Sequence, residues 1–370
     1  MERSCPGPEP EELREEVRTP VWMPLLAPTE LQIAKLASGR PILVIAIDTE
    51  AEFDWRGPFL RTLTSVHNLR NQAKAQEIFD RFGVRPIYLV DYSVATQPEG
   101  YLRVRDILRS NRCEIGAHLH PWVTPPFDEV LSNRTSFSQN LPTFLQKEKL
   151  ARLTEAITAN LGVQPISYRA GRYGVGEEIA DILGSLNYSI DMSVDPGIDM
   201  RHRDGPDFRR ALDRPYWFGR QGGLLEIPST SGFTGLIAHS GFPKSFSIGA
   251  YRQIARPRLN DMYSVGIFAR LRLLERIPLT PEGVTLGELR RVTTTLLSRG
   301  QRIFVFNYHS SSLLPGSTEY VQSQSELSRF LDKIARYLEF FMYEIGGVSM
   351  TPSELRATLS DARTGATPAS

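Results

Sequence analysis

Short apolar runs alternate with amphipathic helical patterns along most of this chain, and this alternation limits the folds that the chain can adopt. The clearest run covers residues 41–47, which are continuously apolar and rich in β-branched side chains. Such a run is typical of a strand that is buried on both faces, as in a parallel sheet. The clearest helical pattern covers residues 325–345, whose large apolar side chains recur on one stripe. Since parallel strands need crossover connections, the alternation predicts an α/β fold.

The number of apolar runs favours a distorted (β/α) barrel of about seven parallel strands over a six-stranded open sheet. The expected strands cover residues 41–47, 84–90, 113–119, 165–169, 188–194, 224–227 and 302–308. The expected helices cover residues 64–82, 102–110, 147–161, 177–186, 286–298 and 325–345. We expect the barrel to span residues 40–357, after a partly disordered N-terminal extension of residues 1–39 and before a disordered tail of residues 358–370.

Composition argues against several classes of protein. The chain has 370 residues and a formal net charge of +1, so no general field attracts nucleic acid or an anionic membrane. No run of about 18 apolar residues is present, and we therefore expect no transmembrane segment. The only cysteines, Cys5 and Cys113, are too few for a cysteine-based zinc site. Residues 201–220 hold six Arg and three Asp beside aromatic residues, and we expect a surface insertion there.

The first 20 residues differ in composition from a secretory signal. They contain six Glu, three Arg and four Pro. A secretory signal needs a basic start and an apolar core, and neither is found in this segment. We therefore expect a cytoplasmic protein.

Polar side chains follow several expected strands, at the positions where a parallel barrel leaves residues free for chemistry. Asp48 and Glu50 come after the first strand on one side, and two such carboxylates repel each other unless a cation or proton lies between them. A loop with solvated acids is the alternative. His118 and His120 share one face of a later strand, so both imidazoles can reach one metal. A hydrogen-bonded pair of histidines is the alternative there.

Two further strand ends carry basic groups. Residues 168–174 read Tyr-Arg-Ala-Gly-Arg-Tyr-Gly, with Arg169 and Arg172 on either side of a glycine. The glycine allows a ligand to approach the backbone, and arginine suits a carboxylate, although a glycine turn with solvated arginines is common. His309 follows the strand at residues 302–308, where a histidine can act as general acid or base or can be structural.

These four segments, in this order, resemble the motifs of the polysaccharide deacetylase superfamily. The resemblance rests on Asp-x-Glu, Glu-Ile-Gly-x-His, Tyr-Arg-x-Gly-x-Tyr-Gly and Tyr-His, and it covers about residues 40–355. It implies a distorted (β/α) barrel that removes acyl groups from N-acetylated sugars with a bound metal, usually zinc. The roles that it implies are a catalytic base at Asp48, metal ligands at Glu50 and His118, a base-orienting Arg169, a final acid at His309, and an Asp191 that orients His309.

The sequence departs from the family pattern in two places. Thr49 separates two acids that are usually adjacent, and Trp122 stands where the second metal-binding histidine is usual. His120 can take over that role because it shares a strand face with His118, which is an inference from strand geometry. The residues expected to contact a sugar are Trp55, Trp122, Arg172, Tyr173 and Tyr308.

Three functions fit these observations. The leading hypothesis is a metal-dependent hydrolase that removes acetyl groups from an N-acetylated sugar or glycoconjugate, with a divalent metal, expected to be zinc, as cofactor. The altered metal motif motivates the first alternative, a non-catalytic barrel that binds carbohydrate or assembly partners. The second alternative is an amidohydrolase that uses the same site on a small non-sugar amide. Metal content separates the first two, and a substrate screen separates the third; the sequence gives no oligomeric state.

Overall fold

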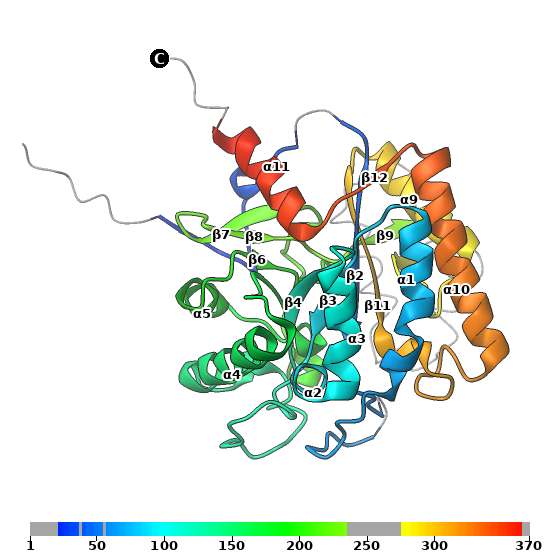
Figure 1. Ribbon diagram of the computed structural model, residues 1–370. Coiled ribbons are helices and arrows are strands. Elements are labelled where there is room, and N and C mark those ends of the chain that lie inside the picture. The colour runs from blue at the N-terminus through cyan, green and yellow to red at the C-terminus, as the bar shows by residue number, and fades with distance from the viewer. Residues whose placement is uncertain (1–20, 37–38, 55–56, 235–274, 365–370) are drawn as a thin grey trace, which may run out of the picture.

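Ten strands of the described residues form one sheet at the centre of the protein (Figure 1). The computed structural model describes residues 21–36, 39–54, 57–234 and 275–364. Seven neighbouring strands of the described sheet run parallel, which confirms the number and direction expected from the sequence. Along the sheet they are β8 (Leu224–Glu226), β6 (Ile190–Asp191), β5 (Ser167–Ala170), β4 (Glu114–Leu119), β3 (Ile87–Val90), β2 (Ile42–Thr49) and β11 (Ile303–His309). The short strand β12 (Val348–Ser349) also pairs with β2.

The sheet continues beyond β8 with antiparallel strands. β7 (Tyr216–Arg220) pairs with β8, and β1 (Trp22–Met23) pairs with β7. β7 lies inside the segment that we expected to be a surface insertion, residues 201–220, and that expectation is wrong for its last residues. Tyr216, Trp217 and Phe218 are buried, so a core strand follows the arginine-rich stretch whose composition suggested a surface segment.

The sheet curls toward a barrel, but among the described residues no strand ladder joins β8 to β11. Two residues bridge this gap instead. Thr230 accepts from Val305 N of β11 at 2.8 Å through Oγ1, and from Leu279 N at 2.9 Å through its backbone carbonyl. Leu279 in turn accepts from Asn307 N of β11 at 3.2 Å through its own carbonyl. The antiparallel pair of β9 (Ser231–Thr234) and β10 (Glu275–Pro278) adjoins these two residues in the chain. The barrel is therefore distorted, as expected.

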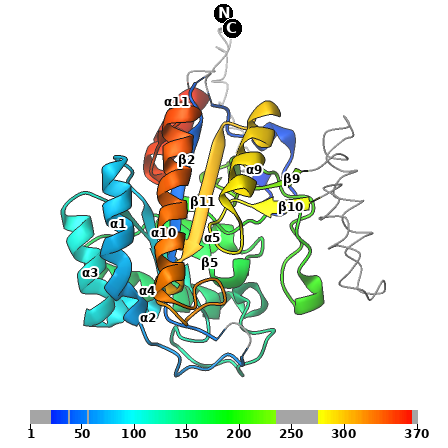
Figure 2. The ribbon, with the colours of Figure 1, turned by 90° about the vertical axis from the view of Figure 1, so that its right-hand side faces the viewer.

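Helices cover the outer face of the sheet (Figures 1 and 2). They are α1 (Gln72–Arg81), α2 (Tyr92–Thr96), α3 (Pro98–Arg109), α4 (Thr143–Leu161), α5 (Ile179–Ser185), α9 (Leu286–Ser298) and α10 (Gln324–Glu339). The helix α11 (Pro352–Thr364) lies instead at the end of the sheet that is uppermost in Figure 1. α1 and α10 contact each other over β2 and β11, as both views show. Within the described ranges, no helix combines the length and apolar character that a membrane crossing requires.

β2 shows how the sheet positions polar side chains. Ile45 packs in the larger hydrophobic cluster, which includes the helix side chains. Val44 and Ala46 belong to a second cluster on the opposite face of the strand, together with residues of β3 and β11. Because side chains alternate along a strand, Asp48 continues the row of Val44 and Ala46. The register pairs Asp48 with His309, so the two residues reach the same end of the sheet.

Residues on both sides of the predicted barrel boundaries, 40 and 357, pack against the rest of the protein. In the expected N-terminal extension, the buried Gln32 donates from Nε2 to Trp217 O at 2.9 Å. At the other end, α11 runs past residue 357 because Leu355 and Leu359 are buried in the second cluster. Residues 21–36 and 358–364 therefore pack as part of the fold, whereas the division into domains stays a prediction.

Candidate active site

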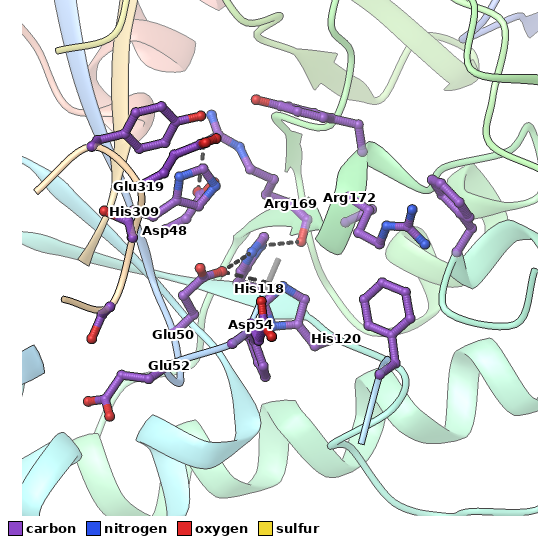
Figure 3. Close-up of a pocket in the computed structure, with 18 of the residues that line it drawn as sticks. Asp48, Glu50, Glu52, Asp54, His118, His120, Arg169, Arg172, His309 and Glu319 are labelled. Carbon is purple, nitrogen blue, oxygen red and sulfur yellow. Dashed lines mark hydrogen bonds and ion pairs between the residues drawn. The ribbon is translucent and has the colours of Figure 1, made fainter. Parts of the chain in front are cut away.

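A pocket of about 870 Å³ opens at the carboxyl ends of the parallel strands (Figure 3). The polar strand ends that the sequence singled out all contribute to its wall. Of the residues predicted to be catalytic or metal-binding, its lining contains Asp48 and Glu50 from the end of β2, His118 and His120 from the end of β4, Arg169 at β5, and His309 at β11. Parallel strands bring their carboxyl ends to one edge, so residues far apart in sequence meet there.

Glu50, His118 and His120 form a buried cluster at the base of this pocket. Glu50 Oε2 lies 3.3 Å from His118 Nε2 and 3.4 Å from His120 Nε2, and one donor atom of each residue lies within 4.8 Å of the others. No hydrogen bond to a described residue satisfies either carboxylate oxygen of Glu50. A buried carboxylate without hydrogen bonds is costly, so this arrangement fits a bound cation.

The other ring nitrogen of each histidine faces an acceptor. His118 Nδ1 donates to Arg169 O at 3.1 Å, and His120 Nδ1 lies 3.5 Å from Asp91 Oδ2. Since a carbonyl or carboxylate accepts the Nδ1 proton, the Nε2 lone pairs are left for a common ligand. Acceptors in this position are typical of histidines that bind a metal.

The protonation of the cluster also suits a cation. Burial lowers the pKa of His120 to about 3, so its ring is neutral, which is the form that ligates a metal. Burial raises the pKa of Glu50 to about 7, against the opposing effects of His309 and His118. A positive ion beside this carboxylate would favour its ionised form. Two imidazoles and one carboxylate are a donor set found in catalytic zinc sites.

Asp48 is held by a buried arginine. Its Oδ1 accepts from Arg169 Nη1 at 2.7 Å, and Arg169 Nε donates to Met192 O at 3.0 Å. Burial opposes the ionisation of Asp48, but Arg169, His118 and His309 outweigh it, and the pKa of Asp48 lies below its ordinary value. Asp48 is thus a carboxylate at neutral pH.

His309 has a carboxylate partner that the sequence analysis missed. Glu282 Oε2 lies 2.8 Å from His309 Nδ1, while Glu282 Oε1 accepts from His309 N at 3.1 Å and from Ser312 Oγ at 2.5 Å. Burial would lower the pKa of His309, but Glu282, Glu50 and Asp48 together raise it to about 10. The ring is therefore protonated at neutral pH. Its Nε2 lies 3.8 Å from Asp48 Oδ2.

The structure corrects the role expected for Asp191. This residue is fully buried in β6, where it accepts a hydrogen bond from Ser193 Oγ. The carboxylate on the His309 ring is Glu282, which comes from the loop between β10 and α9. Burial raises the pKa of Asp191 to about 6, and burial together with the charge of Asp191 raises the pKa of the neighbouring Glu226 well above its usual value. Asp191 thus belongs to a buried carboxyl pair.

The residues expected to contact a sugar divide into three groups. Arg172 and Tyr173 line the pocket. Trp122 and Tyr308 do not line it, and both are fully buried. Trp55 lies outside the described residues.

Trp122 and Tyr308 are packing residues, which corrects the role expected for them. Trp122 stacks on His120 with ring centres 4.5 Å apart. Tyr308 lies edge-on to Phe330 of α10 with ring centres 5.6 Å apart, because strand alternation turns it to the face opposite His309. Trp122 therefore supports a candidate metal ligand from behind.

Comparisons with known proteins find similarity among solved structures alone. No family model matches the chain, and a search of curated proteins finds no match. A structure from Mycobacterium smegmatis, assigned provisionally as a polysaccharide deacetylase, is 16% identical with a TM-score of 0.47, and the match covers 91% of this chain and 98% of that one. The Xyl-CE4 domain of a multidomain xylanase from the hindgut metagenome of Trinervitermes trinervoides is 12% identical (88% and 92% covered, TM-score 0.38). A CE4 family pseudoenzyme from Bacillus anthracis is 10% identical (86% and 66% covered, TM-score 0.38). The first description names the family that the sequence motifs resemble.

Proposed function

We propose that this protein is a metal-dependent hydrolase that removes an acetyl group from an N-acetylated sugar or glycoconjugate. One observation carries the proposal: three complementary groups each contribute side chains to the wall of a single pocket. These groups are the buried cluster of Glu50, His118 and His120, the Asp48–Arg169 ion pair, and the His309–Glu282 pair.

The cluster supplies the ligands. Glu50 would bind a divalent cation through a carboxylate oxygen, and His118 and His120 would bind it through Nε2. When bound there, a cation such as zinc polarises an amide carbonyl and lowers the pKa of a water molecule. The buried acceptors behind the two imidazoles keep both rings turned toward this position.

Asp48 is placed to act as the base. Arg169 occupies Oδ1, so Oδ2 can accept the proton of the attacking water. The ion pair keeps Asp48 ionised and fixes its orientation, since Arg169 is itself held by the backbone carbonyl of Met192.

His309 is placed to act as the acid. Glu282 accepts the Nδ1 proton, so the proton available for transfer is the one on Nε2. The Nε2 atom lies on the Asp48 side of the ring, within the same pocket. Donation of this proton to the departing nitrogen, as the C–N bond breaks, gives a free amine and acetate.

Metal analysis and acetate release together test the proposal. We expect about one divalent metal ion per chain, acetate release from at least one N-acetylated sugar, and loss of release after chelation with recovery on metal addition. The variant His120→Ala should lose metal, whereas His202→Ala, at an exposed residue that does not line the pocket, should keep it. Metal-loaded protein that is folded and releases no acetate from a broad panel would support the non-catalytic alternative. Release from small non-sugar amides alone would support the amidohydrolase alternative.

A further inference from the structure

One wall of the pocket carries two arginine side chains that the proposed hydrolysis does not use. Arg172 lies in the turn η4 (Gly171–Tyr173) directly after β5, and Arg203 lies at the end of the turn η5 (Arg201–Arg203). Both side chains line the pocket. In Figure 3, Arg172 lies on one side of the Glu50–His118–His120 cluster, and Glu52 and Glu319 lie on the other.

The guanidinium of Arg172 is held rigidly. Its Cζ atom lies 3.8 Å from the ring centre of Phe137 and 4.7 Å from that of Phe59, so the group packs against two aromatic side chains. Nη1 donates to Ser136 Oγ and to Asn133 Oδ1, the latter at 3.1 Å. The backbone of Arg172 is left-handed, with φ of 56°, which is uncommon for a residue other than glycine. A planar group fixed in this way loses little side-chain freedom when it binds a ligand.

The positive charge of Arg172 lacks a counter-charge among the described residues. Its hydrogen-bond partners are a hydroxyl, an amide oxygen and a backbone carbonyl, and no carboxylate of the described chain lies within ion-pair distance. Nε and Nη2 donate no hydrogen bond to any described residue, which leaves one edge of the guanidinium open. Burial and the charge of Arg203 lower the pKa of Arg172 to about 10, so it remains a cation at neutral pH.

Like Arg172, Arg203 has no carboxylate partner among the described residues, whereas two arginines near it are paired. Arg201 pairs with Asp199, and Arg209 pairs with Asp207, each through two nitrogens. Arg203 is exposed and forms no ion pair with any residue that the structure describes. Two arginines that face one pocket are therefore both without an anionic partner.

We infer that Arg172, with Arg203, binds an anionic group of the substrate, a carboxylate or a phosphate. The inference rests on the proposed function and specifies its substrate as a negatively charged N-acetylated sugar. The open Nε–Nη2 edge of Arg172 is one of the guanidinium edges that bind two oxygens of a carboxylate or phosphate at once. An anion on this wall would orient the sugar, because the acidic side chains of the opposite wall would repel it.

Four probes with one sugar ring test the inference. They are N-acetylglucosamine, its 1-phosphate, its 6-phosphate, and 2-acetamido-2-deoxyglucuronic acid, which carries a carboxylate at the same position as the 6-phosphate. Calorimetry on the purified, metal-containing protein should show at least one anionic probe binding about 10–100-fold more tightly than the neutral sugar, as a charge-assisted bidentate pair would give. This preference should weaken as salt is raised. The phosphate and carboxylate probes then show which anion the site takes.

Variants locate the anion. Arg172→Gln should remove most of the preference, Arg203→Gln should reduce it several-fold, and Arg201→Gln, at an arginine already paired with Asp199, should leave it unchanged. The exposed Arg203 also serves as the test position if Arg172→Gln does not fold. Equal binding of all four probes, or a preference that survives both Arg172→Gln and Arg203→Gln, would overturn the inference; in the second case the metal itself captures the anion.

Acetate release, measured in parallel, separates this inference from the proposed function. Release from the anionic probes no faster than from the neutral sugar, and at the same rate in wild type and Arg172→Gln, would contradict the inference and leave the hydrolase proposal standing. Arginine-dependent binding of an anionic probe, without acetate release from any probe, would support the anion site and contradict the hydrolase proposal.

Discussion

The pair formed by His309 and Glu282 gives a prediction that separates a catalytic role from a structural one. In the variant Glu282→Gln, the side chain keeps its size but loses the charge that lies 2.8 Å from His309 Nδ1. Two opposite charges about 4 Å apart attract by about 4 kcal/mol at an effective dielectric constant of about 20. Because the His309 side chain is 28% exposed, solvent screens part of this attraction, and we reduce it to about 2–3 kcal/mol. This free energy corresponds to a shift of roughly 2 units in the pKa of His309. The pKa of His309, about 10 in the wild type, should therefore fall to roughly 8 in the variant.

The consequence for catalysis depends on pH. A general acid works only while it is protonated, so the rate falls as pH rises through the pKa of His309. The fall in rate should therefore begin about 2 pH units lower in the variant than in the wild type. A cation at Glu50 lowers the pKa of His309 in both proteins, so the difference between them is the quantity to compare. Folding stability should depend on pH in the same sense as the rate, because the pKa of His309 is higher in the folded protein than in the unfolded chain. The contribution of His309 to stability is complete below about pH 6.5 and is lost as pH rises through its folded pKa.

The pKa can be measured directly by NMR of the histidine rings, with His309→Gln used to assign the resonance, and compared with the pH–rate profile. Glu288→Gln is the control, because Glu288 is a nearby acid whose carboxylate caps α9 through Thr285. A shift of less than about half a unit in Glu282→Gln, or an equal loss of rate at every pH, would refute the role assigned to Glu282.

Three further predictions concern the centre of the pocket. His120→Ala should weaken metal binding by at least about tenfold without unfolding the protein, because the barrel is already packed; competition with a chelating dye measures the affinity, and unchanged affinity would remove His120 from the ligand set. Asp48→Asn should slow turnover by about 10²–10⁴-fold at unchanged metal content, and loss of the metal along with activity would instead make Asp48 a ligand. Trp122→Ala should cost about 3–5 kcal/mol of stability, as for other buried aromatic residues, and should also weaken metal binding. Trp122→Phe should have a smaller effect on both quantities, and thermal unfolding and the same dye assay measure them. A destabilised variant with normal metal affinity would show that the stack on His120 does not orient the ring.

The parts of this site that could be predicted from sequence lie directly after long, regular strands. The apolar run of β2 fixes which face Asp48 and Glu50 occupy, and the alternation in β4 does the same for His118. The parallel arrangement then brings these strand ends to one edge without any further information. The metal, the catalytic roles and the cytoplasmic location stay predictions.

The parts that were missed depend on tertiary contacts without a local pattern. Glu282 lies in a loop, where no periodicity marks a side chain that reaches across to β11. Tyr308 was assigned to the pocket from its residue type, although alternation beside His309 already turned it to the other face. Trp122 follows the end of β4, where alternation no longer applies, and its direction is set by the packing of His120 against it.

Arg169 connects to both halves of the proposed chemistry through different atoms. Its backbone carbonyl accepts from the candidate ligand His118, and its side chain orients the candidate base Asp48. Any residue at position 169 keeps the carbonyl, but only arginine supplies the fork that holds Asp48. Under the proposed function, a single substitution of Arg169 is therefore expected to abolish turnover while the metal stays bound. On this proposal, metal content alone would not report catalytic competence, and the side chain at position 169 would have to be known as well.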